Sequence, residues 1–330
     1  MSFGVGIIGC GLIGQKRAKA LGEGRLLACA DVNEARAHVL TGNTSAKIFT
    51  DWRELLNLPG VEVVVIATVH NSLAEITLAA VEVGKHVLVE KPAARTPAEL
   101  EPIMKVAERG GVKVHVGFNH RYHRAFRKAR ELFETGALGP LMFIRARYGH
   151  GGRIGYDKGW RAKPELSGGG ELIDQGPHLI DLSRWFLGEF QEVRGFVHTY
   201  YWDMPVDDNS FMLLKTEKQQ VAFLHASCTE WKNLFSMEIY GRKGKLEISG
   251  LGGSYGVERL TYYKMLPKMG PPETTSWEFP MEDDSWAVEM AEFYEDIRLD
   301  RYPAVGLNDA YEVLKVIEKV YRESGYDYST

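Results

Sequence analysis

The sequence predicts an α/β protein with two domains, an N-terminal doubly wound parallel sheet and a C-terminal α+β domain with a mostly antiparallel sheet. The chain of 330 residues is too long for one average hydrophobic core. Up to residue 120, short apolar runs alternate with helical segments, the pattern of parallel strands joined by crossover helices. Beyond that residue, strand-like runs follow one another with little helix between them. We therefore predict domains at residues 1–120 and 121–330, with terminal helices that could pack back toward the first domain.

Composition excludes several classes of protein. Apolar residues make up 45% and charged residues 25% of the chain, as in ordinary soluble globular proteins. The net charge of −4 argues against nucleic acid or an anionic membrane as a partner. No signal-peptide pattern or membrane-length apolar run is visible, which predicts a cytoplasmic protein. Cys10, Cys29 and Cys228 lack metal-type spacing, so we expect packing roles, a reducing compartment and no metal site.

The first strand and helix enclose a glycine-rich turn. The apolar run Val5–Ile8 leads directly into the turn, and the helical segment Gln15–Leu21 follows it. The first glycine allows a tight turn, the second lets a pyrophosphate approach the backbone, and the third lets the helix pack on the strand. The free N–H groups of the helix would bind the phosphate. The alternative is a turn without a ligand. The residues predicted to bind a dinucleotide are Gly9, Gly11, Leu12, Ile13 and Gly14.

The second strand, Leu26–Ala30, ends at Asp31. A carboxylate at this place would accept hydrogen bonds from the adenosine ribose and repel a 2′-phosphate, which favours NAD over NADP. Two features qualify this interpretation. Asp31 could instead cap the helix Asn33–Leu40, and Arg36 could accommodate a phosphate.

Three further strand–helix units complete this half. The β-branched run Val61–Ala67 is typical of a strand buried on both faces. Residues 51–54 and 96–99 read as capping boxes. The predicted strands are Ala46–Thr50, Val61–Ala67, His86–Glu90 and Lys113–Phe118, and the predicted helices begin at Asp51, Ser72 and Thr96.

One of these strands ends in Glu90-Lys91-Pro92. In an open parallel sheet, ligands bind outside the carboxyl ends of the strands. Proline fixes its own φ and restricts Lys91, so the backbone of the lysine is held while its side chain points outward. We interpret Lys91 as a functional cation that Glu90 orients. The alternative is an ordinary surface lysine.

The second half begins after Asn119-His120-Arg121 with a basic amphipathic helix near Tyr122–Thr135. Two helices close the chain, near Trp286–Leu299 and Asn308–Arg322, and four prolines before them indicate an irregular segment. The predicted strands are Leu141–Tyr148, Val193–Tyr201, Ser210–Thr216, Gln220–Cys228, Phe235–Tyr240, Lys245–Ile248 and Val257–Lys264.

A glycine-rich segment in this half, residues 168–181, carries an acid and a histidine. Pro177 predicts a helix start, which puts His178 in the first turn and Asp174 just upstream, so the two could face one cavity. The carboxylate would then orient the imidazole. The alternative is a structural histidine, and the same ambiguity holds for Glu171 and Asp181.

With these motifs in order, the sequence resembles the Gfo/Idh/MocA family of oxidoreductases, which includes glucose–fructose oxidoreductase and inositol dehydrogenase. The resemblance implies an N-terminal Rossmann domain and a C-terminal domain whose large open sheet often serves oligomerisation, so a homodimer or homotetramer is expected. It also implies NAD(P)-dependent oxidation or reduction of a carbohydrate-like hydroxyl. Lys91, Asp174 and His178 match the catalytic residues of the family.

Further positions follow from the resemblance. After the fourth strand the family often has Thr-Pro-x-x-x-His, whereas this chain has Thr68-Val69 and then Leu73, which changes that loop. The residues expected to contact the cofactor here are Thr68, Glu90, Lys91 and Asn119. The residues expected to contact the substrate are His120, Tyr148, His150, Arg161 and Asn233.

The mechanism expected is oxidation of a secondary alcohol, with His178 as general base, Lys91 stabilising the negative charge on oxygen and Asp174 positioning both. Cations and aromatic residues in the loop Arg153–Glu165 could hold a sugar phosphate or nucleotide sugar, or could form a charged surface. Two other functions stay open: an NAD-dependent glycosidase with transient redox chemistry and a non-catalytic NAD-binding sensor or repressor. The sequence does not name the substrate.

Overall fold

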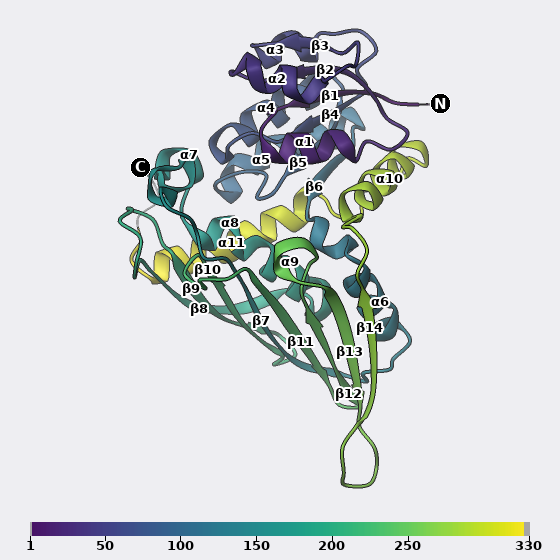
Figure 1. The fold of residues 1–330 in the computed structure, drawn as a ribbon, viewed down its shortest axis with the longest axis vertical. Coiled ribbons are helices and arrows are strands. Elements are labelled where there is room, and N and C mark those ends of the chain that lie inside the picture. The colour runs from purple at the N-terminus through teal and green to yellow at the C-terminus, as the bar shows by residue number, and fades with distance from the viewer. Residues whose placement is uncertain (1, 327–330) are drawn as a thin grey trace. The chain divides into compact units, whose positions relative to one another are not determined.

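A computed structural model describes residues 2–326 (Figure 1). The chain divides into two compact units. The first contains the residues up to Asn119 together with Trp286–Glu312, and the second contains His120–Ser285 together with the residues from Val313 onward. The functional assignment of each predicted domain stays a prediction.

The first unit is built on a six-stranded parallel sheet in the order β3-β2-β1-β4-β5-β6. This order reverses direction at β1 and β4, as in a doubly wound sheet, so the predicted fold class is confirmed. The strands are β1 Gly4–Ile8, β2 Arg25–Ala30, β3 Lys47–Phe49, β4 Val63–Ile66, β5 His86–Glu90 and β6 Val114–Gly117.

Side chains cap three of the helices of this unit at their N-termini. Asn33, Asp51 and Thr96 each accept a hydrogen bond from a backbone N–H of the helix that follows. The predicted start at Ser72 is wrong because the helix begins earlier, and the Ser72 hydroxyl donates to the carbonyl of Val69 instead. The helices are α1 Leu12–Lys19, α2 Glu34–Thr41, α3 Trp52–Leu56, α4 His70–Glu82, α5 Pro97–Gly110 and α10 Ser285–Arg298; α11 is Leu307–Glu323.

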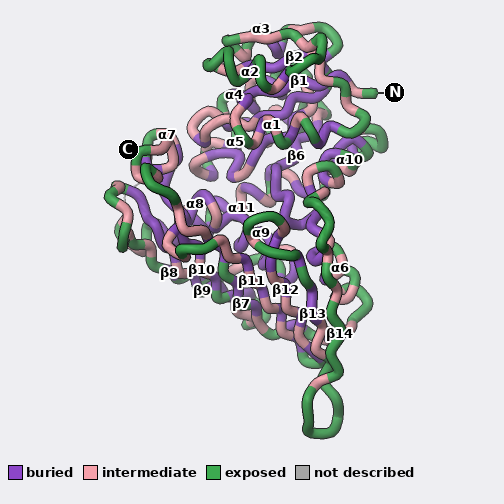
Figure 2. The backbone as a smooth tube through the Cα atoms, in the orientation of Figure 1, coloured by how far each residue is buried: buried purple, intermediate pink, exposed green. Residues whose placement is uncertain are grey.

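The core of the first unit combines the sheet with a helix from the far end of the chain. Val5 and Val65 lie in the strands that Met290 and Phe293 of α10 cover. The ring of Tyr294 stacks on Phe3 with 5.0 Å between centroids. Figure 2 shows β1 and β4 buried along their length, and β5 is buried from Val87 onward, as the predicted apolar runs require.

The second unit is built on an open eight-stranded sheet in the order β14-β13-β12-β11-β7-β10-β9-β8. All neighbours pair antiparallel except β7 and β10, so the predicted mostly antiparallel sheet is confirmed. The segment predicted to be irregular contains the edge strand β14. The strands are β7 Leu141–Gly149, β8 Phe190–His198, β9 Asn209–Thr216, β10 Val221–Ser227, β11 Leu234–Gly241, β12 Gly244–Ser249, β13 Glu258–Lys264 and β14 Glu273–Phe279.

Helix α9 packs against β7 and β10 of this sheet, and among its residues only Trp185 is not buried. It starts at Gly176 with Pro177 in its first turn, close to the predicted start. The short α8 directly precedes it. The helices are α6 Arg124–Glu134, α7 Pro164–Ser167, α8 Glu171–Asp174 and α9 Gly176–Leu187, with 3₁₀ turns at Asn119–Tyr122, Tyr156–Lys158, Trp160–Ala162 and Gly253–Tyr255.

Within residues 2–326, no helix has the length and apolar character that crossing a membrane requires. The same residues contain no group of three or more histidine, cysteine, aspartate or glutamate side chains arranged to hold a metal ion. Cys10, Cys29 and Cys228 are buried free thiols.

Candidate functional site

The glycine turn between β1 and α1 is tight and closely packed. Gly9 has φ of +92°, and its N–H donates to Ala30 O at 2.8 Å. A Cβ on Gly14 would lie 1.9 Å from Gly9 O, so only glycine lets α1 pack this closely. Gly11, in contrast, faces open space within 4 Å of its Cβ position. The turn therefore leaves room at the second glycine, where a pyrophosphate would approach the backbone.

Asp31 braces this turn. Its Oδ2 accepts the N–H of Cys10 at 2.7 Å and its Oδ1 accepts the N–H of Asn33 at 2.8 Å. The side chain that caps α2 is Asn33, so the capping role considered for Asp31 belongs to its neighbour. Arg36 lies exposed in the first turn of the same helix. Asp31 thus joins the glycine turn to the end of β2, where the ribose of a dinucleotide is expected.

Three other candidates follow neighbouring strands at one edge of the sheet. Thr68 comes after β4, Lys91 directly after β5 and Asn119 shortly after β6. The Thr68 hydroxyl accepts a hydrogen bond from Ser72 at 2.8 Å. Glu90, in contrast, points into the unit: its side chain is buried and accepts a hydrogen bond from Arg17 Nε at 2.6 Å. The carboxyl ends of parallel strands are where ligands of such sheets bind.

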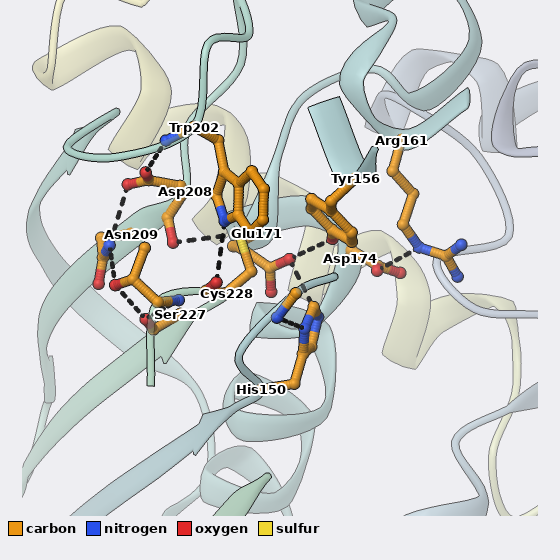
Figure 3. Close-up of polar contacts among 12 residues, drawn as sticks. His150, Tyr156, Arg161, Glu171, Asp174, Trp202, Asp208, Asn209, Ser227 and Cys228 are labelled. Atoms are coloured by element: carbon orange, nitrogen blue, oxygen red, sulfur yellow. Dashed lines mark hydrogen bonds and ion pairs between the residues drawn. The ribbon is translucent and has the colours of Figure 1, made fainter. Parts of the chain in front are cut away.

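In the second unit, Asp174 lies at the end of α8 and is buried. Arg161 Nε donates to its Oδ2 at 2.6 Å (Figure 3). The charge of Asp174 holds the pKa of Arg161 above its ordinary value, against the opposing effect of burial. The cation considered for an anionic substrate is therefore bound to the candidate catalytic carboxylate.

His178 is buried in the first turn of α9 among aromatic rings. The rings of His120 and His178 meet edge to face with 3.7 Å between centroids, and the ring of Tyr148 lies 5.9 Å from that of His178. Burial, followed by a hydrogen bond with Tyr255 and nearby carboxylates, raises the pKa of Tyr148 well above its ordinary value. Tyr148 is therefore a neutral hydroxyl at neutral pH. The structure brings three predicted residues together here.

Glu171 is the centre of a second polar cluster (Figure 3). Its Oε1 accepts the hydroxyl of Tyr156 at 2.7 Å and lies 3.4 Å from Nε2 of His150. The Nδ1 of His150 accepts the N–H of Gly152, so the proton of a neutral ring is on Nε2. Burial and the Glu171 charge raise the pKa of Tyr156, which keeps it a donor. The sequence alone does not distinguish a functional from a structural role for Glu171, because its partners become its neighbours only in the folded chain.

Two other predicted residues have separate contacts. Asn233 donates to Ser254 Oγ at 2.6 Å. Asp181 forms a buried ion pair with Arg121. Asp181 therefore has a structural partner in the same unit.

A hydrogen-bonded loop adjoins the Glu171 cluster (Figure 3). The buried carboxylate of Asp208 accepts the backbone N–H groups of three successive residues at 2.8–3.1 Å; they are Tyr200, Tyr201 and Trp202. Trp202 Nε1 donates to Cys228 O, and its ring lies 5.6 Å from that of Tyr156. No local sequence pattern predicts this loop, because Asp208 accepts hydrogen bonds from residues that precede it by six to eight positions.

Comparison with known families assigns the chain. Residues 3–118 match the model described as "Oxidoreductase family, NAD-binding Rossmann fold". Residues 126–247 match "GFO/IDH/MocA C-terminal domain". The chain belongs to the Gfo/Idh/MocA family. The resemblance noted from the motifs is thereby confirmed, and the first unit carries the NAD-binding Rossmann fold of the family.

Several Gfo/Idh/MocA relatives are named as dehydrogenases. Levoglucosan dehydrogenase of Pseudarthrobacter phenanthrenivorans is 32% identical over 51% of this chain and 43% of that protein. Inositol 2-dehydrogenase of Gluconacetobacter diazotrophicus is 31% identical over 58% of this chain and 56% of that protein. The chain thus spans about half the length of these two relatives. Myo-inositol 2-dehydrogenase of Thermotoga maritima is 24% identical over 92% of this chain and 91% of that protein.

Solved structures share the fold over the whole chain. Levoglucosan dehydrogenase in complex with NADH and levoglucosan has a TM-score of 0.89 and 22% identity, with 98% of both chains covered. Aldose-aldose oxidoreductase from Caulobacter crescentus, complexed with glycerol, has a TM-score of 0.87 and 25% identity, again with 98% of both chains covered. These likenesses agree with the topology of both sheets.

Proposed function

We propose that the protein is an NAD-dependent dehydrogenase that transfers a hydride between nicotinamide and a secondary hydroxyl of a sugar, polyol or nucleotide sugar. The observation that carries the proposal is the pairing of a braced dinucleotide turn with Lys91, Asp174 and His178 in a chain of this family. The names of the relatives, which include inositol and levoglucosan dehydrogenases, support the same class of substrate.

The first unit would hold the cofactor. The N–H groups at the start of α1, with Gly11 leaving space beside them, suit the pyrophosphate. Asp31 suits the adenosine ribose and disfavours the 2′-phosphate of NADP. Thr68 and Asn119 are proposed to contact the remainder of NAD. When bound, NAD supplies the carbon that accepts the hydride. Because Glu90 is hydrogen-bonded to Arg17, we propose that it orients Lys91 and does not contact the cofactor.

The chemistry requires a proton acceptor and a cation at the reacting oxygen. His178 is proposed to take the hydroxyl proton, which typically contributes about 10²- to 10⁴-fold to the rate. Lys91 is proposed to donate a hydrogen bond to the same oxygen and stabilise its developing negative charge. Asp174 is proposed to position the other two groups, and its ion pair with Arg161 keeps this carboxylate in one place.

The substrate contacts are proposed in the second unit. The ring of His120 contacts those of His178 and Tyr148, and His150 belongs to the Glu171 cluster. Asn233 stays a further candidate. Because Arg161 is bound to Asp174, we propose it as a partner of that carboxylate, and an anionic substrate would depend on other cations of the loop. These are Arg153, Lys158 and Lys163.

The test is a screen of polyols, aldoses and nucleotide sugars for NADH formation with purified protein and NAD. We expect at least one neutral sugar or polyol to be oxidised. Lys91→Met and His178→Ala should each lower kcat by about 10²-fold or more, because each removes an interaction that strengthens in the transition state. Either variant, correctly folded and turning over at the wild-type rate, would exclude that residue from the catalytic apparatus.

The same measurements separate the other functions. A glycosidase with transient redox chemistry would cleave a glycoside without net NADH formation. A sensor or repressor would bind NAD and a ligand but produce no NADH with any substrate. In both cases the dehydrogenase proposal fails.

We also propose that the outer face of the open sheet joins two or more copies of the chain. Phe196, Leu213 and Phe223 are each at least 49% exposed. They lie on neighbouring strands, with Leu213 paired to Phe223 and Phe196 to Phe211. Exposed apolar patches of this kind often mark interfaces. Light scattering should show a dimer or tetramer in the wild type and a smaller species in Phe223→Lys. A wild-type monomer at micromolar concentration would contradict the proposal.

A further inference from the structure

We propose that Arg17 and Glu289 are positioning residues for Lys91, acting through Glu90. The inference rests on the role proposed above for Lys91. Arg17 precedes the lysine by 74 positions and Glu289 follows it by 198, and no motif of the chain connects them.

Four buried polar side chains meet in the first unit. Arg17 of α1 is 1% exposed and donates through Nε to Glu90 Oε1 at 2.6 Å. Its Nη1 forms an ion pair with Glu289 of α10, which is fully buried. His115 Nε2, also fully buried, lies 3.3 Å from the other oxygen of Glu289. We call these residues the Arg17 cluster. It joins the helix of the glycine turn, two strands and the C-terminal segment at one point.

The charges of the Arg17 cluster make it dependent on the lysine. Apart from His115, which contacts Glu289, the cluster holds two carboxylates and the single guanidinium of Arg17. Burial raises the pKa of Glu90, while the charges of Arg17 and Lys91 act in the opposite direction. Lys91 is the next residue along the chain, and its positive charge favours the ionised form of Glu90. By the same interaction, the fixed carboxylates favour one position of the ammonium group.

The neighbouring sequence leaves space for this ion pair. Gly117 of β6 pairs directly with Glu90 of β5. A Cβ at Gly117 would lie 2.7 Å from Arg17 Nη2 and 3.1 Å from both carboxylate oxygens of Glu90. On another side, the ring of Trp286 lies 4.4 Å from Arg17 Cζ. Any side chain at residue 117 would displace the pair, so its geometry is determined by the surrounding residues.

The backbone conformation at Lys91 depends on the position of Glu90. The carbonyl of Glu90 accepts the N–H of Ala93 at 2.9 Å, which closes a turn around Lys91 and Pro92. Ala93 has φ of +71°, a conformation that residues other than glycine adopt only when their surroundings enforce it. The lysine thus lies in a tight turn between an anchored carboxylate and a constrained alanine. Loosening Glu90 should loosen this turn.

The first test measures that transmission without any substrate. In Glu289→Gln, hydrogen–deuterium exchange of the peptide containing Ala93 should be at least fivefold faster than in the wild type, while peptides of β1 and β4 keep wild-type exchange. Glu295→Gln is the matched control, because Glu295 lies on the same helix but is exposed and paired with Arg301. It should change neither. Unchanged exchange around Ala93 in Glu289→Gln overturns the proposal.

The second test asks whether the Arg17 cluster acts through Lys91. On the substrate oxidised fastest in the screen, Glu289→Gln should lower kcat about tenfold with less than a twofold change in the KM for NAD. In the Lys91→Met background the same substitution should lower kcat less than twofold, because residues acting as one unit are not additive. A tenfold loss in both backgrounds would show a role independent of Lys91 and overturn the proposal.

A second variant covers the case in which Glu289→Gln does not fold. Gly117→Ala keeps every charge but pushes a methyl group against Arg17 and Glu90, and the same two results are expected from it. Wild-type kcat in a folded Gly117→Ala variant, with unchanged exchange around Ala93, overturns the proposal. Failure of the proposed function is a different result, namely Lys91→Met retaining wild-type turnover or no substrate reducing NAD. The exchange measurement tests the link to the lysine turn in either case.

Discussion

Substitution of Asp31 offers a direct measurement of how the glycine turn binds its cofactor. Asp31 accepts the N–H of Cys10 at 2.7 Å and that of Asn33 at 2.8 Å. A hydrogen bond to a charged group contributes about 1.5–3 kcal/mol, and Asp31 is half-buried, so about 1.5 kcal/mol for each is appropriate. Asp31→Ala removes both bonds, a loss of about 3 kcal/mol, whereas Asp31→Asn keeps an oxygen for one of them.

These losses predict graded effects on binding. If NAD requires the turn as it stands, its Kd should rise about tenfold in Asp31→Asn and about a hundredfold in Asp31→Ala, since 1.4 kcal/mol corresponds to a factor of ten. The preference for NAD over NADP should fall in both variants because the charge that repels a 2′-phosphate is gone. Calorimetric titration of each variant with NAD and NADP measures both quantities.

Glu34 provides the control. It is exposed in the first turn of α2, and its carboxylate lies 3.6 Å from His38 rather than near the glycine turn. Glu34→Gln removes one negative charge from the same region and should leave both Kd values within about twofold, since an exposed pair contributes roughly 0–1 kcal/mol. Binding of NAD by Asp31→Ala within threefold of the wild type, or an unchanged ratio of NAD to NADP affinity, would refute the reasoning.

Two further predictions concern the second unit. Arg161→Ala should lower kcat at least tenfold on a neutral polyol, because Asp174 loses the guanidinium at 2.6 Å; an increase in KM confined to phosphorylated sugars would show instead that Arg161 binds the substrate anion. Burial raises the pKa of Asp207 to about 6, although Leu172, Tyr321 and Gly170 donate hydrogen bonds to it. Because the folded state then holds a proton that the unfolded chain releases near pH 4, the stability of the wild type relative to Asp207→Asn should fall as pH rises from about 4 to about 6 and stay level above. A difference in Tm that does not vary over this range would contradict the assignment.

The fold of the first unit could be predicted because the sequence patterns that indicate its strands, turns and helices are local. Strand, turn and helix succeed one another within a few residues around Gly9–Gly14, and caps such as Thr96 lie next to the helices they start. The helix start predicted at Ser72 was wrong because serine occurs inside the first turn of a helix as well as at its N-cap. The strand β14 was missed because it is an exposed edge strand between prolines and lacks the apolar alternation of a half-buried strand.

The sequence identifies candidate residues of the site but not the side chains that they contact. Asp174 and His178 stand out because a proline and glycines place them at a helix start. That Arg161 binds Asp174, or that Tyr156 donates to Glu171, depends on how a loop folds back on the element after it. The pairing of Arg17 with Glu289 joins residues 272 positions apart, and no local pattern distinguishes a buried arginine on α1 from an exposed one.

The packing of α10 on the first sheet has a consequence for the order of events during synthesis. Tyr294 packs on Phe3, and Phe293 packs in the same core as β1. Both residues leave the ribosome long after residue 119, so their partners stay uncovered until then. At translation rates of about 5–20 residues per second, that interval lasts roughly ten to forty seconds. During it, the nascent N-terminal segment exposes an apolar surface to chaperones. A truncated chain ending at residue 120 would keep that surface permanently uncovered.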